Sequence, residues 1–94
     1  MNLEARPGTL GRCRVGFRGR VVALRLDRGA GEPPAVDDLE RRLLEMGFVE
    51  GARVELLHQG WLGGDPIAVR VDDATVALRR RDAASVLVAE ENAA

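Results

Sequence analysis

The sequence has no tyrosine and no lysine, and its 94 residues include one cysteine, one histidine, one tryptophan and two phenylalanines. A single cysteine cannot form an internal disulfide bond, so Cys13 is predicted to be a small buried hydrophobic residue. Proteins that bind single-stranded nucleic acid stack bases on aromatic side chains, and this chain has few to offer. The scarcity of aromatic residues therefore argues against nucleic-acid binding as the main function.

Long apolar runs are also missing. No uncharged apolar stretch approaches the roughly 18 residues that a membrane-spanning helix needs, and the first residues lack the apolar segment of a signal peptide. We therefore expect a cytoplasmic protein without direct membrane insertion. The length predicts one domain over residues 1–94, and the sequence leaves the oligomeric state open.

Groups that could carry catalysis are few. The hydroxyl residues are Thr9, Thr75 and Ser85, and the only imidazole, His58, lies in no nucleophile motif. Cys13 and His58 could each bind a transition metal, but no CxxC, HxxxH or HxH spacing is present. The sequence therefore predicts no enzyme, no cofactor and no dedicated metal site, and leaves a weak transition-metal-binding chaperone as an alternative.

Charge is unevenly distributed along the chain. Residues 1–30 hold seven arginines and two acidic residues, whereas residues 31–94 hold seven arginines and thirteen acidic residues. Arginines on the outward positions of amphipathic strands explain this pattern most simply. A basic module that binds an acidic partner or nucleic acid is the alternative.

Residues 11–28 alternate arginine with aliphatic residues at a period near two, which predicts β structure. Gly16 and Gly19 are predicted to mark a turn or bulge between two strand pieces, and residues 28–35 read as a linker because Pro33–Pro34 stops a strand. The expected faces of the strand are Val22, Leu24 and Leu26 on one side and Val21, Ala23 and Arg25 on the other.

A helix is predicted at about residues 37–46. Its apolar residues recur at intervals of three and four, and Asp37 with Glu40 resembles an amino-terminal capping box. Gly47 suits the left-handed position after a helix, where Phe48 can fold back on Leu43.

Four short strands are predicted after the helix, at residues 52–58, 66–71, 75–79 and 85–88, with Asp72–Asp73 as the turn between the second and third. Together with the amino-terminal strands they favour a mainly β fold, a small SH3-like barrel of five or six strands with one inserted α-helix. The residues expected to share one face of the first of these strands are Val54, Leu56 and His58.

Trp61 lies in the segment GWLGGDP, whose turn needs only Gly60, Gly63, Gly64, Asp65 and Pro66. The turn leaves Trp61 unexplained. One interpretation places Trp61 and Leu62 over an open end of the barrel as a plug. The other makes them an exposed anchor for a protein partner, with Arg79 and Arg80 nearby as donors to acidic groups.

The order of these segments resembles the FeoA family, small accessory proteins of bacterial ferrous iron transport. The resemblance covers about residues 9–88 and rests on LLEMGFVEGARVELL, GGDPIAVRV and VALRRRDAASVLV. It implies an SH3-like barrel with a helical insertion. It also implies a partner, the FeoB membrane permease with its cytoplasmic G-protein domain.

The family pattern matches this chain at a helix exit, at the entry to a central strand and at a strand end. The matched positions are Leu43, Gly47 and Gly51; Gly64, Asp65 and Pro66; and Leu78, Arg79 and Arg80. Met46 and Phe48 stand where the family commonly has leucine, Asp72–Asp73 replaces a turn that usually contains glycine, and residues 28–38 are longer than expected. None of the matched positions is catalytic.

The resemblance therefore implies a non-catalytic accessory or regulatory protein of ferrous iron uptake that binds the G-protein-containing part of FeoB. The same domain also occurs attached to iron-responsive repressors, so a repressor-type or nucleic-acid-binding SH3-like module stays as the second interpretation. The sequence does not separate activation of GTP hydrolysis from transporter assembly or regulation.

Overall fold

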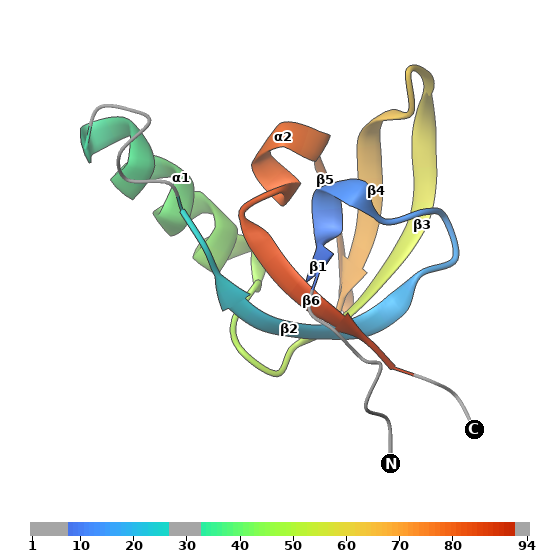
Figure 1. Cartoon of the computed structure of the whole chain (residues 1–94), viewed down its shortest axis with the longest axis horizontal. Coiled ribbons are helices and arrows are strands. Elements are labelled where there is room, and N and C mark those ends of the chain that lie inside the picture. The colour runs from blue at the N-terminus through green and yellow to red at the C-terminus, as the bar shows by residue number, and fades with distance from the viewer. Residues whose placement is uncertain (1–7, 27–32, 92–94) are drawn as a thin grey trace.

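The computed structural model describes residues 8–26 and 33–91, and of residues 33–37 the backbone alone. Figure 1 shows a curved sheet with one long helix beside it. The elements in chain order are β1 (Gly8–Thr9), the 3-10 helix η1 (Leu10–Arg12), β2 (Arg18–Leu24), α1 (Pro33–Met46), β3 (Arg53–Leu62), β4 (Asp65–Val71), β5 (Ala74–Leu78), α2 (Arg80–Ala83) and β6 (Val86–Glu90).

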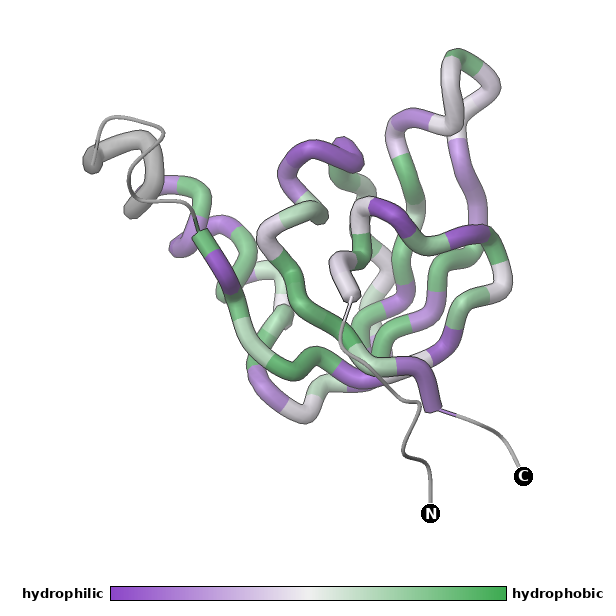
Figure 2. The backbone as a smooth tube through the Cα atoms, viewed as in Figure 1, coloured by the Kyte–Doolittle hydropathy of each residue, from purple (hydrophilic) through white to green (hydrophobic). Residues whose placement is uncertain are grey.

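The described strands form one antiparallel sheet in the order β1-β6-β2-β3-β4-β5. The sheet curls around a small apolar core, and Figure 2 shows hydrophobic stretches along its strands. The prediction of a mainly β barrel of five or six strands is confirmed. The largest fully buried side chains are Leu10, Leu43, Phe48, Leu56, Ile67, Val69, Val86 and Val88.

Helix α1 begins at Pro33, four residues before the predicted start. Proline is well tolerated in the first turn of a helix, where the missing N–H has no partner to lose. The Pro33–Pro34 pair therefore opens the helix, and the prediction that it belongs to a linker is wrong. Asp37 lies inside the helix and is not its amino-terminal cap.

The end of α1 agrees with the prediction. Gly47 has a φ of +105°. The Phe48 N–H donates to the Leu43 carbonyl at 3.1 Å, and the Gly47 N–H donates to the Leu44 carbonyl at 3.0 Å. These two bonds form a Schellman motif, which satisfies the last carbonyls of the helix and turns the chain back. Phe48 is thereby placed at the centre of the core, fully buried.

The amino-terminal region differs from the predicted pair of strands. Residues Leu10–Arg12 form a 3-10 turn, and among the described residues before it Gly8–Thr9 pairs as a strand. Gly16 lies in a turn as predicted, with a φ of +98°. Gly19 instead lies within β2, where a Cβ atom would come within 2.2 Å of the Ala89 carbonyl oxygen. Close approach of β6, rather than a bulge, requires this glycine.

Two bulges change the predicted faces of the strands. The pairing of β2 with β6 shifts between Val21 and Ala23, and Val21 is buried while Leu24 is half-buried. The pairing of β3 with β4 shifts between Leu56 and His58, so that Leu56 is buried and His58 is exposed. A bulge adds a residue to one strand and reverses the alternation beyond it. The prediction that His58 shares a face with Leu56 is therefore wrong.

The turn between β4 and β5 is Asp72–Asp73, as predicted. Asp72 has a φ of +53°, and its carboxylate accepts the Arg53 N–H at 3.1 Å. Aspartate tolerates the left-handed region better than most residues because its short side chain can bond locally. The family's usual glycine is therefore not needed at this turn.

Candidate partner-binding surface

The β3–β4 hairpin carries the two most exposed large apolar side chains of the described residues. Its two-residue turn, Gly63–Gly64, has φ values of +70° and +79°, as a tight hairpin turn requires. Trp61 is 92% exposed and Leu62 is 66% exposed. The hairpin projects from the barrel (Figure 1), and both side chains at its tip face solvent. The interpretation of Trp61 as a plug is wrong.

The base of the tip requires close backbone contact. A Cβ atom on Gly60 would lie 2.0 Å from the Asp65 carbonyl oxygen, so Gly60 allows the two hairpin arms to approach. The Asp65 carboxylate accepts the backbone N–H of Arg80 at 2.8 Å. The sequence predicts a bond from Asp65 to nearby amides, and the amide that it binds lies 15 residues further on, at the start of α2.

Arg80 connects three separate segments of the chain. Its guanidinium donates to the Gly64 carbonyl at 2.9 Å and to the Gln59 side-chain oxygen at 2.8 Å, both in the hairpin. It also donates to the carbonyls of Gly11 at 3.1 Å and Cys13 at 2.8 Å. Four of its five N–H groups are thus used within the protein. Arg80 is therefore not a free donor for a partner, and we assign it to holding the hairpin.

Arg79 remains available at this surface. It is exposed, and its guanidinium has no hydrogen bond or ion pair with any residue among 8–26 and 33–91. Of the four residues expected at the partner-binding surface, Trp61, Leu62 and Arg79 are exposed, and Arg80 is half-buried beneath them. Sequence spacing contains no signal for the bonds of Arg80, because its partners are distant in the chain.

The two predicted metal-binding side chains occupy different environments. Cys13 is half-buried, its Sγ donates to the Thr9 carbonyl at 3.4 Å, and burial raises the pKa of its thiol, opposed in part by the charge of Arg80. His58 is exposed on the hairpin. Within the described residues, no group of three or more His, Cys, Asp or Glu side chains is arranged to hold a metal ion.

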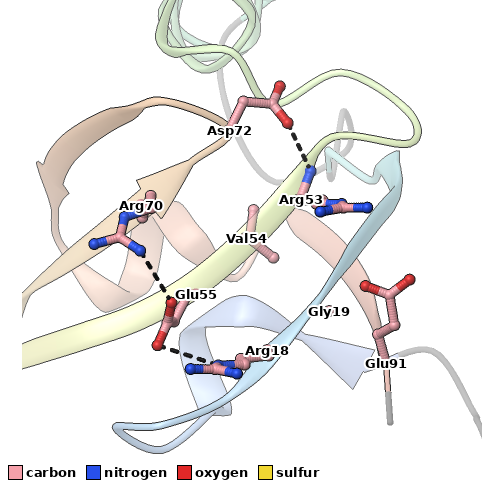
Figure 3. A pocket seen from close by; sticks show the side chains of 8 residues that line it. All are labelled: Arg18, Gly19, Arg53, Val54, Glu55, Arg70, Asp72 and Glu91. Atoms are coloured by element: carbon pink, nitrogen blue, oxygen red, sulfur yellow. Dashed lines mark hydrogen bonds and ion pairs between the residues drawn. The ribbon is translucent and has the colours of Figure 1, made fainter. Parts of the chain in front are cut away.

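A charged groove with a volume of about 540 Å³ is lined by residues of β2, β3 and β4 together with Asp72 and Glu91. Figure 3 shows Glu55 between two arginines, with Arg18 Nε 3.3 Å from one carboxylate oxygen and Arg70 NH1 3.4 Å from the other. The two guanidinium groups share one carboxylate, and both arginines are exposed to solvent, so each pair stabilises the fold only weakly. The groove offers neither a nucleophile nor a general base arranged for catalysis.

No helix in the described part of the chain is long and apolar enough to cross a membrane.

Comparison with known proteins identifies the domain. The family model described as the FeoA domain matches residues 8–90. No curated protein sequence matches the chain at a significant level.

Three solved structures illustrate the similarity. The FeoA of Stenotrophomonas maltophilia, solved in complex with zinc and described as a procaryotic SH3 domain protein, is 31% identical, with 92% of this chain and 98% of that chain covered and a TM-score of 0.69. The FeoA protein of Chlorobium tepidum is 30% identical over 89% of this chain and 70% of that one, with a TM-score of 0.69. A manganese-dependent transcriptional repressor is 24% identical, with a TM-score of 0.72, and the match covers 93% of this chain but 43% of the repressor. The repressor shares the fold alone.

Proposed function

Because the chain belongs to the FeoA family, we propose that it is a non-catalytic accessory protein of ferrous iron uptake that binds the cytoplasmic G-protein-containing part of a FeoB-type permease. The family is implicated in ferrous iron transport and is not an enzyme family. The observation that carries the proposal is the exposed pair Trp61 and Leu62 at the hairpin tip. Large aromatic side chains of this kind dominate the binding energy of protein interfaces.

The way the hairpin is held supports this proposal. An exposed tryptophan on a loose loop would lose conformational entropy on binding. Here the arms are closely apposed at Gly60, and Arg80 ties Gln59 and Gly64 to the barrel. The tip is therefore presented in one orientation before the partner arrives.

We expect the Trp61→Ala variant to bind the G-protein region of the permease more weakly by about 2 kcal/mol or more. Its free energy of unfolding should change by less than about 0.5 kcal/mol, because the side chain is exposed and contacts little of the core. Calorimetric titration measures the affinity, and urea unfolding measures the stability.

Leu44→Ala provides the matched control, because Leu44 is 45% exposed on α1, away from the hairpin. This variant should bind as tightly as the unmodified protein. Equal affinity of the Trp61→Ala and Leu44→Ala variants for the permease region would show that the hairpin tip is not part of the interface. If the unmodified protein fails to bind the permease region at all, the proposed partner is wrong.

Transition-metal binding is a second candidate, favoured by the zinc complex of the Stenotrophomonas maltophilia FeoA. We expect any Fe(II) or Zn(II) binding by this chain to be weak and independent of His58, since the described residues supply no ligand cluster and burial raises the pKa of the Cys13 thiol, which disfavours the metal-binding thiolate. Anaerobic calorimetry on the His58→Ala variant tests this. Stoichiometric, submicromolar affinity that disappears in the variant would establish a site instead.

A further inference from the structure

Four arginines near the base of the β3–β4 hairpin have no side-chain partner among the residues that the structure describes. Arg12 and Arg14 flank Cys13, and Arg79 and Arg81 flank Arg80. All four are exposed, and their guanidinium groups make no hydrogen bond or ion pair with any residue in 8–26 or 33–91. We call this set, Arg12, Arg14, Arg79 and Arg81, the arginine patch.

The bonds of Arg80 show that the patch is continuous. Its guanidinium reaches the carbonyls of Gly11 and Cys13 on one side and that of Gly64, in the hairpin turn, on the other. Residues adjacent to these positions in the chain are therefore neighbours in space. Figure 2 shows hydrophilic residues along α2, and hydrophilic residues alternating with hydrophobic ones in the segment after η1.

On the groove side of the sheet, Arg18, Arg20 and Arg70 have carboxylate partners, whereas the Arg53 side chain has none among the described residues. Arg18 and Arg70 both meet Glu55, and the Arg20 side chain binds Glu91 at 2.8 Å. Near the patch, Asp65 accepts the Arg80 N–H and Asp82 pairs with Arg42 at 3.3 Å, while the charge of Glu90 acts on Cys13, between Arg12 and Arg14. Among the described residues, none of the four patch arginines is in an ion pair, although the whole chain carries a formal net charge of -1.

We propose that the arginine patch and the Trp61–Leu62 tip form one docking surface for an acidic protein surface, with an apolar pocket for Trp61 surrounded by Asp and Glu side chains. This rests on the proposed function and specifies the chemistry of that partner. An aromatic centre with an arginine-rich polar rim is the composition of protein interfaces. The arginine fork binds carboxylates in bidentate geometry, and exposed charges of one sign accelerate association with an oppositely charged partner.

A protein partner fits these observations better than nucleic acid does. Base stacking needs several aromatic side chains, and the described surface around the patch offers Trp61 alone. The apolar part of the surface is one tryptophan and one leucine on a braced hairpin. Two adjacent apolar side chains on a hairpin whose backbone is held by Arg80 suit an apolar pocket.

The test compares two double variants with the same change in charge. Arg12→Glu with Arg14→Glu reverses half of the patch, whereas Arg25→Glu with Arg53→Glu reverses two exposed arginines at the strand ends away from the hairpin tip, whose side chains make no hydrogen bond or ion pair within residues 8–26 and 33–91. Circular dichroism and thermal unfolding confirm that both variants are folded. The probes are the permease G-protein region, a synthetic peptide rich in Asp and Glu with one leucine pair, phosphatidylcholine vesicles containing phosphatidylglycerol, and a DNA duplex. Binding is followed by Trp61 fluorescence and by amide chemical shifts.

We expect the unmodified protein to bind the acidic peptide and the permease region. The Arg12→Glu, Arg14→Glu variant should lose about ten-fold in affinity for both, and the control variant should lose less than about two-fold. Equal losses in the two variants would overturn the proposal, because net charge alone would then explain binding. Patch-dependent binding to vesicles or DNA without binding to the peptide would also overturn it.

The outcomes separate this inference from the proposed function. Peptide binding through the patch without binding to the permease region retains the acidic docking surface and rejects the proposed partner. Binding of the permease region that is unaffected by the Arg12→Glu, Arg14→Glu change retains the partner and rejects the patch.

Discussion

A Gly47→Val variant is expected to lose roughly 2 to 4 kcal/mol of its free energy of unfolding. Gly47 has a φ of +105°, which is unfavourable for any residue with a Cβ atom and most unfavourable for a β-branched one. A Cβ atom there would also approach Val71 Cγ1 to 3.2 Å, so the side chain would crowd the core beside β4. For a small domain, a loss of this size lowers the melting temperature by on the order of 10 °C or more.

Gly51 provides the control that separates the two causes. It has a φ of +88°, but a Cβ atom on it would meet nothing within 4 Å. Gly51→Val should therefore lose only the backbone contribution, roughly 1 to 2 kcal/mol. Thermal and urea unfolding of both variants measure the difference. Equal losses of unfolding free energy in Gly47→Val and Gly51→Val would show that Val71 moves aside at no energetic cost. An unchanged stability of the Gly47→Val variant would contradict the assignment of Gly47 as the helix stop.

An Arg80→Met variant is expected to lose roughly 2 to 4 kcal/mol and to loosen the hairpin. Methionine keeps much of the aliphatic stem but removes every donor, so the carbonyls of Gly11, Cys13 and Gly64 lose a charged partner. Bonds to charged groups contribute more than neutral ones, although the half-exposed site lets water replace some of them. Urea unfolding measures the loss of stability.

Arg81→Met is the matched control for this experiment, because Arg81 is the next residue in α2 and is exposed without a partner among the described residues. It should stay within about 0.5 kcal/mol of the unmodified protein. Amide hydrogen exchange gives a second measurement: Arg80→Met should raise exchange at Gln59 and Gly64, whereas Arg81→Met should not. Unchanged exchange in the Arg80→Met protein would show that the hairpin keeps its position without the arginine.

Patterns within a few residues predict the turns and helix ends of this fold that depend only on neighbouring residues. The Gly47–Phe48 helix stop and the Asp72–Asp73 turn were predictable, because each depends on a residue's own tolerance for positive φ and on neighbours within a few positions. The start of α1 was mistaken for a linker because proline is common both in linkers and at the first helical positions. The conformational propensity of proline therefore does not distinguish a linker from the start of a helix.

The candidate site depends on contacts that sequence spacing cannot show. Whether Trp61 covers the core or faces solvent depends on where the hairpin arms end relative to the barrel, and two register shifts in β3–β4 decide that. Arg80 was predicted, with Arg79, to donate to an acidic partner because both lie at a strand end near Trp61 and Leu62. The Arg80 side chain bonds to residues 16 to 69 positions away in the chain. A single sequence contains no pattern that predicts contacts at such separations.

Pairing of the first described strand with the last has a practical consequence for larger assemblies. Gly8 lies opposite Val88, so β1 and β6 share one edge of the sheet, on the side of the molecule away from the hairpin tip (Figure 1). A tag, a surface linkage or a second domain attached near either end therefore leaves the hairpin accessible. The same geometry makes this barrel suitable as a module in longer polypeptides, in keeping with the share of the manganese-dependent repressor that it matches.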